Sequence, residues 1–182
     1  LISALNRQEI DKKSLLNSIK SWKSSHLIVL GDTIIDQYAA CEAVGLSAEA
    51  PVVVVRELAN KNYIGGAAIV ASHIRALGAT CDLISVVGND EIADIARKSI
   101  DLNNVGLNLI VDPSRPTTFK KRYVVENQKL FRVSRLEDHC LEKHIEDKLI
   151  VQLEEKAKNA DGIVISDFVY GVITNRVLLA VH

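Results

Sequence analysis

Three short runs of aliphatic residues, each followed by an acidic or amide side chain, constrain the fold of this chain more than any other feature of its sequence. The runs are His26–Leu30, Cys81–Val87 and Gly162–Ser166, and the polar residues that follow them are Asp32, Asn89, Asp90 and Asp167. Apolar runs of this length are typical of parallel strands that are buried on both faces. Because ligands bind beyond the carboxyl ends of such strands, we expect these polar side chains to share one rim of the sheet.

Helix-type patterns separate these strands. The segments expected to be helical are 67–77, which follows a glycine pair, 92–100 and 141–157, whose apolar residues recur every four positions, and the stretch from Thr174 onwards. Further β-type segments are 51–55, 118–125 and 129–134, and a loose amphipathic pattern between Leu5 and Trp22 favours an N-terminal helix. Strands that alternate with helices predict an α/β fold with a mainly parallel sheet flanked by helices.

Composition excludes several classes of protein. The 182 residues are 48% apolar and 25% charged, with a formal net charge of −1. This balance fits a globular domain and gives no electrostatic drive toward nucleic acid or an anionic membrane. No stretch approaches the roughly 18–20 uninterrupted apolar residues of a membrane span. Cys41, Cys81 and Cys140 lie far apart, so we expect no disulfide framework and a reducing compartment, the cytoplasm.

Asp32 and Asp36, in the segment Gly31-Asp-Thr-Ile-Ile-Asp36, are the first candidate site residues. Carboxylates at a strand end accept hydrogen bonds from hydroxyl groups, and a pair can hold a polyol at two points. The alternative is turn formation by Asp32 and a helix-capping or surface role for Asp36. Gly65 and Gly66, directly before a predicted helix, either let a ligand approach free backbone N–H groups or serve close helix–sheet packing.

A basic segment in the predicted hairpin 118–134 is the second candidate. Strand alternation puts Lys120 and Arg122 on one face and Lys121 on the other. A basic face beside a crevice suits a phosphate group, particularly when it includes arginine. The alternative is a solvated edge hairpin that its lysines protect from pairing.

Motifs for other chemistries are missing. The chain has neither the Rossmann glycine fingerprint nor a Walker phosphate loop, which argues against a dehydrogenase or another nucleotide-binding α/β protein that uses them. No metal site is expected, because no further ligand pairs with His139, Cys140 and His144 at the start of a charged helix. No arrangement for nucleophilic catalysis by serine or cysteine is identifiable.

In their order and spacing, these segments resemble the PfkB (ribokinase-like) carbohydrate kinases, and most closely the heptose 7-phosphate kinase module of bacterial ADP-heptose synthesis. The resemblance runs from about Leu27 to the end of the chain. It is carried by Gly31-Asp-Thr-Ile-Ile-Asp-Gln-Tyr38, Leu46-Ser-Ala-Glu-Ala-Pro-Val52, Gly65-Gly-Ala-Ala68, Ala76-Leu-Gly-Ala79, Val87-Gly-Asn-Asp-Glu91, Asp112-Pro-Ser-Arg-Pro-Thr-Thr118, Lys120, Arg122, Asn127-Gln128 through Arg132, and Ile165-Ser-Asp-Phe168 with Gly171-Val172.

This resemblance implies a ribokinase-like fold with a β lid over the sugar site, the lid strands lying within about 38–60 and 112–135. It also implies transfer of a phosphoryl group from ATP, with Mg²⁺, to a hydroxyl group of a sugar or sugar phosphate, and a homodimer formed through the lid. By the same resemblance the sugar is contacted by Asp32, Asp36, Gly65 and Gly66. Candidates for the lid-side surface and the substrate's own phosphate are Lys120, Arg122 and Gln128.

Three positions depart from the family pattern. Ile69 stands where the family usually has asparagine after Gly-Gly-Ala-Ala, Tyr170 stands where it often has lysine, and Ser134 replaces a common aspartate. Each change removes a polar or charged group expected near the site. They keep open an alternative function, a non-catalytic sugar-phosphate-binding or dimerisation module with a degenerate kinase site.

The family's Gly-Ala-Gly-Asp motif, which carries the catalytic base and the anion hole, does not occur before His182. We therefore expect residues 1–25 to be a helical extension and residues 26–182 to be the N-terminal part of a sugar kinase domain that is incomplete at its C-terminus. The catalytic base and the main ATP and Mg²⁺ site would lie beyond this chain. This piece alone would be inactive. Its strand edges and apolar helix faces would either lower its solubility or be covered by further polypeptide. The absence of methionine, at position 1 as elsewhere, indicates that Leu1 is not the native start.

Overall fold

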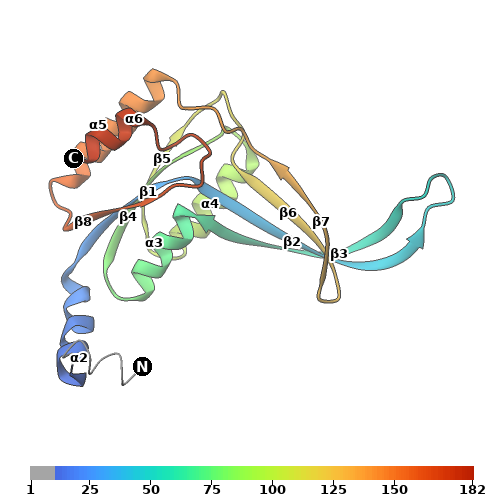
Figure 1. Cartoon of the computed structure of the whole chain (residues 1–182), viewed down its shortest axis with the longest axis horizontal. Helices are drawn as coiled ribbons and strands as arrows, with labels where there is room; N and C mark the ends of the chain where they lie inside the picture. The colour runs from blue at the N-terminus through green and yellow to red at the C-terminus, as the bar shows by residue number, and fades with distance from the viewer. Residues whose placement is uncertain (1–10) are drawn as a thin grey trace.

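Residues 11–182 are described by a computed structural model, in which a central parallel sheet continues into a second, projecting sheet (Figure 1). The first sheet, sheet A, has the order β5-β4-β1-β8, and all its neighbouring strands are parallel. Its strands are β1 (His26–Gly31), β4 (Thr80–Val87), β5 (Gly106–Val111) and β8 (Gly162–Ser166). The predicted mainly parallel sheet is confirmed. β5 is missing from the sequence-based prediction because Asn108 interrupts its short apolar run.

Helices cover both faces of sheet A and enclose two separate cores. α3 (Ala67–Ala76) and α4 (Glu91–Asp101) pack on one face, and α5 (Lys143–Ala157) and α6 (Asn175–Val181) pack on the other. Alternate residues of β1 serve the two cores, since Ile28 and Leu30 face α5 and α6 whereas Val29 faces α3 and α4. Burial of each such side chain contributes about 1.5–3 kcal/mol. The mainly aliphatic strand sequences follow from this covering on both faces.

β1 lies where the direction of strand addition reverses. The chain passes from β1 to β4 across the α3 face and later reaches β8 across the α5 face. Ligands of open α/β sheets bind beyond the carboxyl ends of the strands at such a reversal. There a Cβ at Gly31 would lie 2.0 Å from the Ser166 carbonyl oxygen, and the Asp32 N–H donates to the same oxygen at 3.2 Å. The structure thus places Asp32 at the expected binding edge.

Sheet B projects from this edge and is called the lid below (Figure 1). Its strands are β2 (Thr33–Leu46), β3 (Val53–Gly66), β6 (Phe119–Val125) and β7 (Gln128–Arg135), in the order β3-β2-β6-β7. β2 pairs with β3 antiparallel and with β6 parallel, and β6 pairs with β7 antiparallel. Only Asp32 separates β1 from β2, so the polypeptide passes directly from sheet A into the lid.

The first two lid strands are longer than the sequence predicts. Asp36, expected in a helix cap or on the surface if it has no binding role, lies inside β2, and the strand expected at 51–55 begins at Val53 and continues to Gly66. The reason is tertiary, because β2 pairs along residues 35–41 with the whole of β6, far away in the sequence. The predicted hairpin of β6 and β7 is confirmed.

Two helical segments precede sheet A. α2 (Lys12–Ser21) is capped by Asp11, whose carboxylate accepts the Ser14 N–H at 2.5 Å, and the 3-10 helix η1 (Trp22–Ser24) follows it. The helix predicted between Leu5 and Trp22 is confirmed for this part, while residues 1–10 lie outside the described residues. In the described part of the chain, no helix has the length and apolar character needed to cross a membrane.

Gly66 provides the first test of the fold. Its φ is 58°, and a Cβ there would lie 2.1 Å from the Asp32 carbonyl oxygen. We expect Gly66→Ala to lower the free energy of unfolding by about 3 kcal/mol or more, because it adds a backbone clash to a conformation that L residues rarely adopt. Urea unfolding followed by circular dichroism measures the change.

Gly162→Ala is the matched control for Gly66→Ala. A Cβ at Gly162 would meet only Leu27 Cδ2, at 3.4 Å, so this change should alter the free energy of unfolding by less than about 1 kcal/mol. Equal stability of the two variants would contradict the proposed constraint at Gly66.

Candidate functional site

One face of the lid gathers charged and aromatic side chains. The strand register puts Asp36 of β2 opposite Tyr63 of β3 and Lys120 of β6, and it puts Tyr38 opposite Arg122. Because alternate residues of a strand share a face, these side chains lie on the same side of the lid. The sequence-based placement of Lys120 and Arg122 on one face is confirmed.

An ion pair between Asp36 and Arg122 lies at the centre of this face. The Arg122 guanidinium donates to Oδ1 of the Asp36 carboxylate. The exposed fraction of the side chain is 24% for Asp36 and 19% for Arg122. Arg122 Cζ also lies 5.4 Å from the centroid of the Tyr38 ring, and Tyr38 meets Tyr63 edge to face with centroids 5.6 Å apart. Asp36, Tyr38 and Tyr63 line an open cavity of about 330 Å³. This cavity therefore combines a paired carboxylate with aromatic walls.

The glycine pair ends β3 beside this carboxylate. A Cβ at Gly65 would lie 3.0 Å from Asp36 Oδ2, so the glycine leaves room next to the second carboxylate oxygen. Gly66 packs against the Asp32 carbonyl group, whose oxygen also accepts the Ala67 N–H at 2.8 Å. The two glycines thus pack against different groups, Gly65 against the Asp36 carboxylate and Gly66 against the Asp32 carbonyl group.

Asp32 is buried and turns away from the lid cavity. Only 2% of its surface is exposed. Its Oδ2 accepts the N–H groups of Phe168 at 2.7 Å and Tyr170 at 3.4 Å, and its Oδ1 accepts that of Val172 at 3.4 Å. Burial raises the pKa of this carboxyl above its ordinary value, the three N–H groups offset part of the rise, and the charge of Asp167 adds to it. Its partners are the backbone of the loop after β8.

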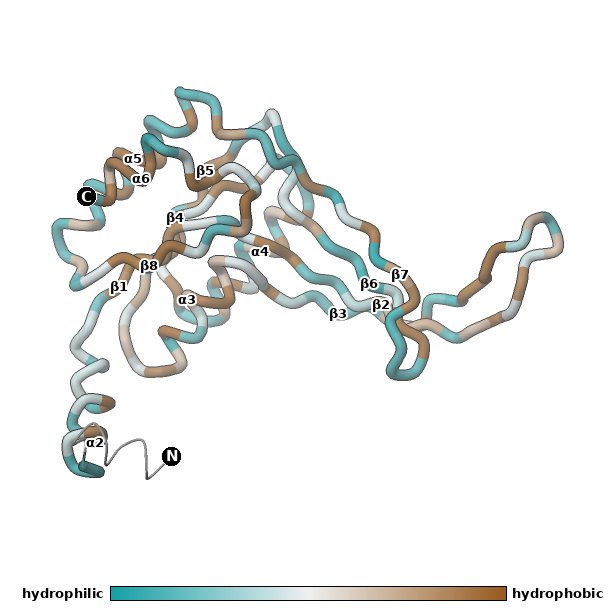
Figure 2. The backbone as a smooth tube through the Cα atoms, in the orientation of Figure 1, coloured by the Kyte–Doolittle hydropathy of each residue, from teal (hydrophilic) through white to brown (hydrophobic). Residues whose placement is uncertain are grey.

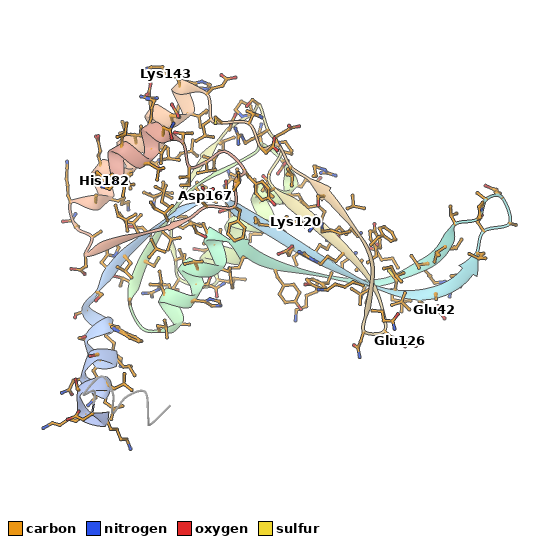
Figure 3. All side chains as sticks on the ribbon, in the orientation of Figure 1. Glu42, Lys120, Glu126, Lys143, Asp167 and His182 are labelled. Atoms are coloured by element: carbon orange, nitrogen blue, oxygen red, sulfur yellow. The ribbon has the colours of Figure 1, made fainter. Side chains whose placement is uncertain are left out.

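That loop approaches the lid through Tyr170. Lys120 Nζ lies 5.0 Å from the centroid of the Tyr170 ring, within the range of a cation–π interaction. Figure 3 shows Lys120 and Asp167 where sheet A meets the lid, and Glu126 at the far end of the β6–β7 hairpin. Gln128 begins β7 next to that far end. The structure therefore does not bring Gln128 to the other candidate residues.

A buried arginine that the sequence analysis does not single out joins three loops behind Tyr170. Arg115 donates from Nε to Asp112 Oδ2 at 2.8 Å, from Nη1 to the Tyr170 carbonyl at 3.0 Å, and from Nη2 to the His139 carbonyl at 2.9 Å. Burial alone would raise the pKa of Asp112, but hydrogen bonds from Ser114 and Arg115 outweigh it and hold this pKa below its ordinary value. The sequence feature that could have indicated this buried pair is an aspartate and an arginine three residues apart in a turn, Asp112 and Arg115.

Two other polar residues make contacts away from the cavity. Lys121 lies on the opposite face of the lid, as predicted, with its Nζ 2.8 Å from Glu57 Oε2. Asp90, expected on the rim with Asp32, instead caps α4 through the Ala93 N–H at 2.9 Å and accepts the Thr117 N–H at 2.8 Å. Asp90 thus links the start of α4 to the segment that enters β6.

Tyr38 and Tyr63, which line the cavity, are absent from the sequence-based candidates. A usable signal was present, because each lies two positions from a candidate on its own strand, Tyr38 from Asp36 and Tyr63 from Gly65. The family resemblance places a lid strand only within about 38–60, and the residue pattern does not show that 33–46 is one continuous strand. Without the bounds of the strand, the period of two cannot be applied.

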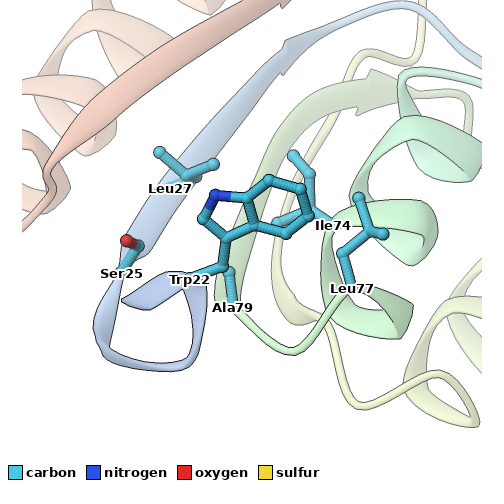
Figure 4. Close-up of a pocket in the computed structure, with 6 residues that line it drawn as sticks. All are labelled: Trp22, Ser25, Leu27, Ile74, Leu77 and Ala79. Carbon is cyan, nitrogen blue, oxygen red and sulfur yellow. The ribbon is translucent and has the colours of Figure 1, made fainter. Parts of the chain in front are cut away.

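A more enclosed cavity lies at the opposite edge of sheet A (Figure 4). It has a volume of about 220 Å³, and its lining residues are Trp22, Ser25, Leu27, Ile74, Leu77 and Ala79. Leu27 and Ala79 mark the amino-terminal ends of β1 and β4. Because this lining carries no charged group and lies away from the carboxyl ends of the strands, we do not assign the functional site to it.

The structure thus combines a parallel α/β sheet, a lid that begins at its switch point, and a carboxylate with two basic side chains on one lid face, and proteins with open α/β sheets commonly bind small ligands at such a switch point. The profile of the pfkB family carbohydrate kinases matches residues 24–181. The chain belongs to this family, and the resemblance inferred from its motifs is confirmed.

Curated relatives share about a third of their sequence with this chain. The bifunctional protein HldE of Campylobacter jejuni is 32% identical over 88% of the chain, and that of Helicobacter hepaticus is 35% identical over 85%. The chain spans only 33% and 32% of these two relatives, respectively. The similarity therefore concerns one part of a longer protein.

Solved structures confirm the fold. Phosphofructokinase-2 from Escherichia coli in complex with fructose-6-phosphate aligns with a TM-score of 0.60 and 17% identity, covering 78% of this chain and 45% of that protein. A carbohydrate kinase from Agrobacterium tumefaciens aligns with a TM-score of 0.56 and 13% identity over 78% of this chain and 45% of that protein. At these identities the likeness establishes the ribokinase-like architecture alone.

The buried ion pair Asp112–Arg115, next to Tyr170, can be tested for its contribution to stability. We expect Asp112→Asn to lower the free energy of unfolding by about 3–5 kcal/mol, because it leaves the Arg115 guanidinium buried without its counter-charge. The exposed pair Asp94–Arg97 gives the control Asp94→Asn, which should cost less than about 1 kcal/mol. Denaturant unfolding at pH 7 measures both.

The difference in stability between the wild type and Asp112→Asn should also depend on pH. The pKa of Asp112 lies below its ordinary 3.8 in the folded chain, so its stabilising contribution is complete above the unfolded-state pKa. It is lost as the pH falls through the lowered folded-state pKa. Stability of Asp112→Asn should therefore depend less on pH below about 4 than that of the wild type. Parallel curves for the two proteins would contradict this assignment.

Proposed function

We propose that this chain supplies the sugar-binding part of a kinase that transfers a phosphoryl group from ATP to a hydroxyl group of a sugar phosphate. The observation that carries the proposal is the Asp36–Arg122 ion pair on the lid face, beside Gly65. Membership of the pfkB family supports a carbohydrate substrate. The motifs shared with heptose 7-phosphate kinases favour a heptose 7-phosphate-like acceptor, and the E. coli structural neighbour is described with a phosphorylated sugar, fructose-6-phosphate.

In this proposal different lid residues bind different parts of the substrate. Asp36, which lines the lid cavity beside Gly65, accepts hydrogen bonds from sugar hydroxyl groups. Lys120 and Arg122 neutralise the phosphate that the substrate already carries, and Arg122 is shared between this phosphate and Asp36. Tyr38 and Tyr63 present their rings to the apolar side of the sugar. These contacts hold the acceptor in one orientation, which phosphoryl transfer requires.

ATP and Mg²⁺ complete the proposed reaction, ATP as phosphoryl donor and Mg²⁺ as neutralising charge. Within residues 11–182, no three His, Cys, Asp or Glu side chains are grouped so as to hold a metal ion. From the family resemblance, we propose that the main ATP and Mg²⁺ site lies outside this chain. The catalytic base is likewise proposed to lie outside the chain, and the chain alone is proposed to be inactive.

A second candidate function is binding without catalysis, as a sugar-phosphate-binding or dimerisation module. Two substitutions favour it. Ile69 lies in the first turn of α3, directly after Gly65-Gly-Ala-Ala68, where relatives of this type usually carry asparagine, and Tyr170 replaces a lysine at the edge of the site. Retention of Asp36, Arg122 and Lys120 on one face fits either function, so phosphoryl transfer itself is the discriminating measurement.

We also propose that the lid pairs with a second copy of the chain. Large apolar side chains are exposed along it, namely Leu46, Val52, Val53, Leu58, Phe131 and Val133. Figure 2 shows these hydrophobic stretches on the outer part of the β2–β3 hairpin and on β7. An exposed apolar β surface of this kind usually marks an interaction site.

Asp36 is the residue on which the proposed kinase function depends most. In the full-length protein, Asp36→Asn should lower kcat/KM for the sugar phosphate about 100-fold, because it removes a charged acceptor for sugar hydroxyls. Lys120→Gln should raise KM for the phosphorylated sugar about tenfold and leave KM for its unphosphorylated form unchanged. Steady-state kinetics on both sugars measure these effects.

Glu42→Gln is the control for these two variants, since Glu42 pairs with Arg56 in an exposed part of the lid. It should leave kinetics unchanged. An unaltered kcat/KM in Asp36→Asn would remove Asp36 from the site. Binding of the sugar phosphate by calorimetry without any phosphoryl transfer in the full-length protein would favour the non-catalytic alternative.

Lid pairing predicts a shift in oligomeric state. Phe131→Glu places a charge on the exposed lid surface and should convert a dimer to a monomer in light scattering at micromolar concentration. Val151→Glu is the matched control, because Val151 is 62% exposed on α5, away from the lid. A wild-type monomer, or dissociation by Val151→Glu alone, would contradict pairing through the lid.

A further inference from the structure

The loop that joins β8 to α6, residues 167–174, surrounds a carboxylate of its own chain. The N–H groups of Phe168, Tyr170 and Val172 all donate to the Asp32 carboxylate, and together they engage both of its oxygens. Backbone N–H groups that converge in this way form an anion-binding arrangement. Here the anion is internal, so these three donors are not free to bind a substrate phosphate.

The backbone of this loop is strained next to Asp32. Val169 has φ 63°, a conformation that β-branched residues rarely adopt, and Gly171 has φ 86°. A Cβ at Gly171 would lie 2.0 Å from the His139 carbonyl oxygen. Such conformations persist only when the surrounding structure holds them, and they concentrate at functional sites.

Two buried side chains supply that restraint at Tyr170. Asp32 accepts the Tyr170 N–H, and Arg115 donates to the Tyr170 carbonyl at 3.0 Å. Both backbone groups of this residue are thus fixed by side chains that are 2% and 7% exposed. The ring that they place lies 5.0 Å from Lys120 Nζ on the lid. Asp32 is therefore linked to Lys120 through one loop residue.

We propose that Asp32 is a positioning residue rather than a sugar ligand: its carboxylate holds the 167–174 loop so that the Tyr170 ring sets the position of the Lys120 ammonium group. The ring stands where the family often has a lysine, and it orients a lysine that comes from the lid instead. A cation held over an aromatic face keeps its outward N–H donors available for an anion. The role of Lys120 toward the substrate's phosphate rests on the proposed function, whereas the link from Asp32 to Lys120 does not.

The test uses the full-length protein and two readouts that do not need activity. Hydrogen exchange of wild-type protein should show protected amides at 168, 170 and 172, although Phe168 is exposed. Asp32→Asn should increase exchange at least tenfold at one or more of these amides, because the side-chain nitrogen that replaces one carboxylate oxygen cannot accept their hydrogen bonds. It should also raise the rate of Lys120 acylation by an N-hydroxysuccinimide ester several-fold, as measured by peptide mass spectrometry.

Matched variants separate positioning from general destabilisation. Tyr170→Leu should raise Lys120 acylation to the same extent while the 168 and 172 amides stay protected, since it removes the ring but not the backbone contacts. Asp36→Asn should leave the loop amides protected. If a sugar phosphate is turned over, Asp32→Asn and Tyr170→Leu should raise its KM about tenfold with kcat within a factor of about three.

The outcomes distinguish this inference from the kinase proposal. Rapid wild-type exchange at 168, 170 and 172, or unchanged Lys120 acylation in Tyr170→Leu, would overturn the positioning role, and neither measurement depends on the folding of Asp32→Asn. An unchanged loop in folded Asp32→Asn would overturn it as well. Altered exchange and acylation in a protein that phosphorylates no sugar would support the positioning role and reject the kinase function.

Discussion

The junction at Asp32 is the constraint on which the rest of the structure depends. Within one residue the chain leaves sheet A and enters the lid, and the backbone of Asp32 contacts both other segments that meet there. Its N–H donates to Ser166 of β8, and its carbonyl accepts from Ala67 at the start of α3. Gly66 must approach this carbonyl too closely for any side chain. The lid is therefore anchored to the core at both of its first two strands, which fixes where its inner face can lie.

This anchoring gives each carboxylate near the junction a separate task. Asp32 is buried against backbone N–H groups, which satisfy its carboxylate without a counter-ion. Asp36, four residues further along the chain, lies on the partly exposed face of the lid and pairs with Arg122. A charge buried without partners would destabilise the fold, and both arrangements avoid this. Only the second arrangement leaves a carboxylate oxygen and positive charge close to open space, which is the combination that a polyol carrying a phosphate requires.

The structure shows what replaces the family's lysine at position 170. A lysine in the loop after β8 would bring its charge from sheet A, while the tyrosine has no charge and instead lies against Lys120 of the lid. The positive charge is thus kept near the junction but is supplied by a different element. Ile69 has no such compensation among its neighbours, and nothing in the structure explains its replacement of a polar group.

The sequence by itself determined the elements that depend on local pattern. Mainly aliphatic runs specified buried parallel strands, a glycine pair specified the entry to α3, and motif order specified the family. The period of two also placed Lys120 and Arg122 on one face. Local pattern could not show β5, the full length of β2 and β3, the tyrosines of the cavity, or which aspartate faces it. Those features rest on contacts between distant segments, such as Arg122 with Asp36, 86 positions apart, and Phe168 with Asp32, 136 positions apart. Only the tertiary structure decides them, because hydrogen bonds and ion pairs depend on which groups meet in space.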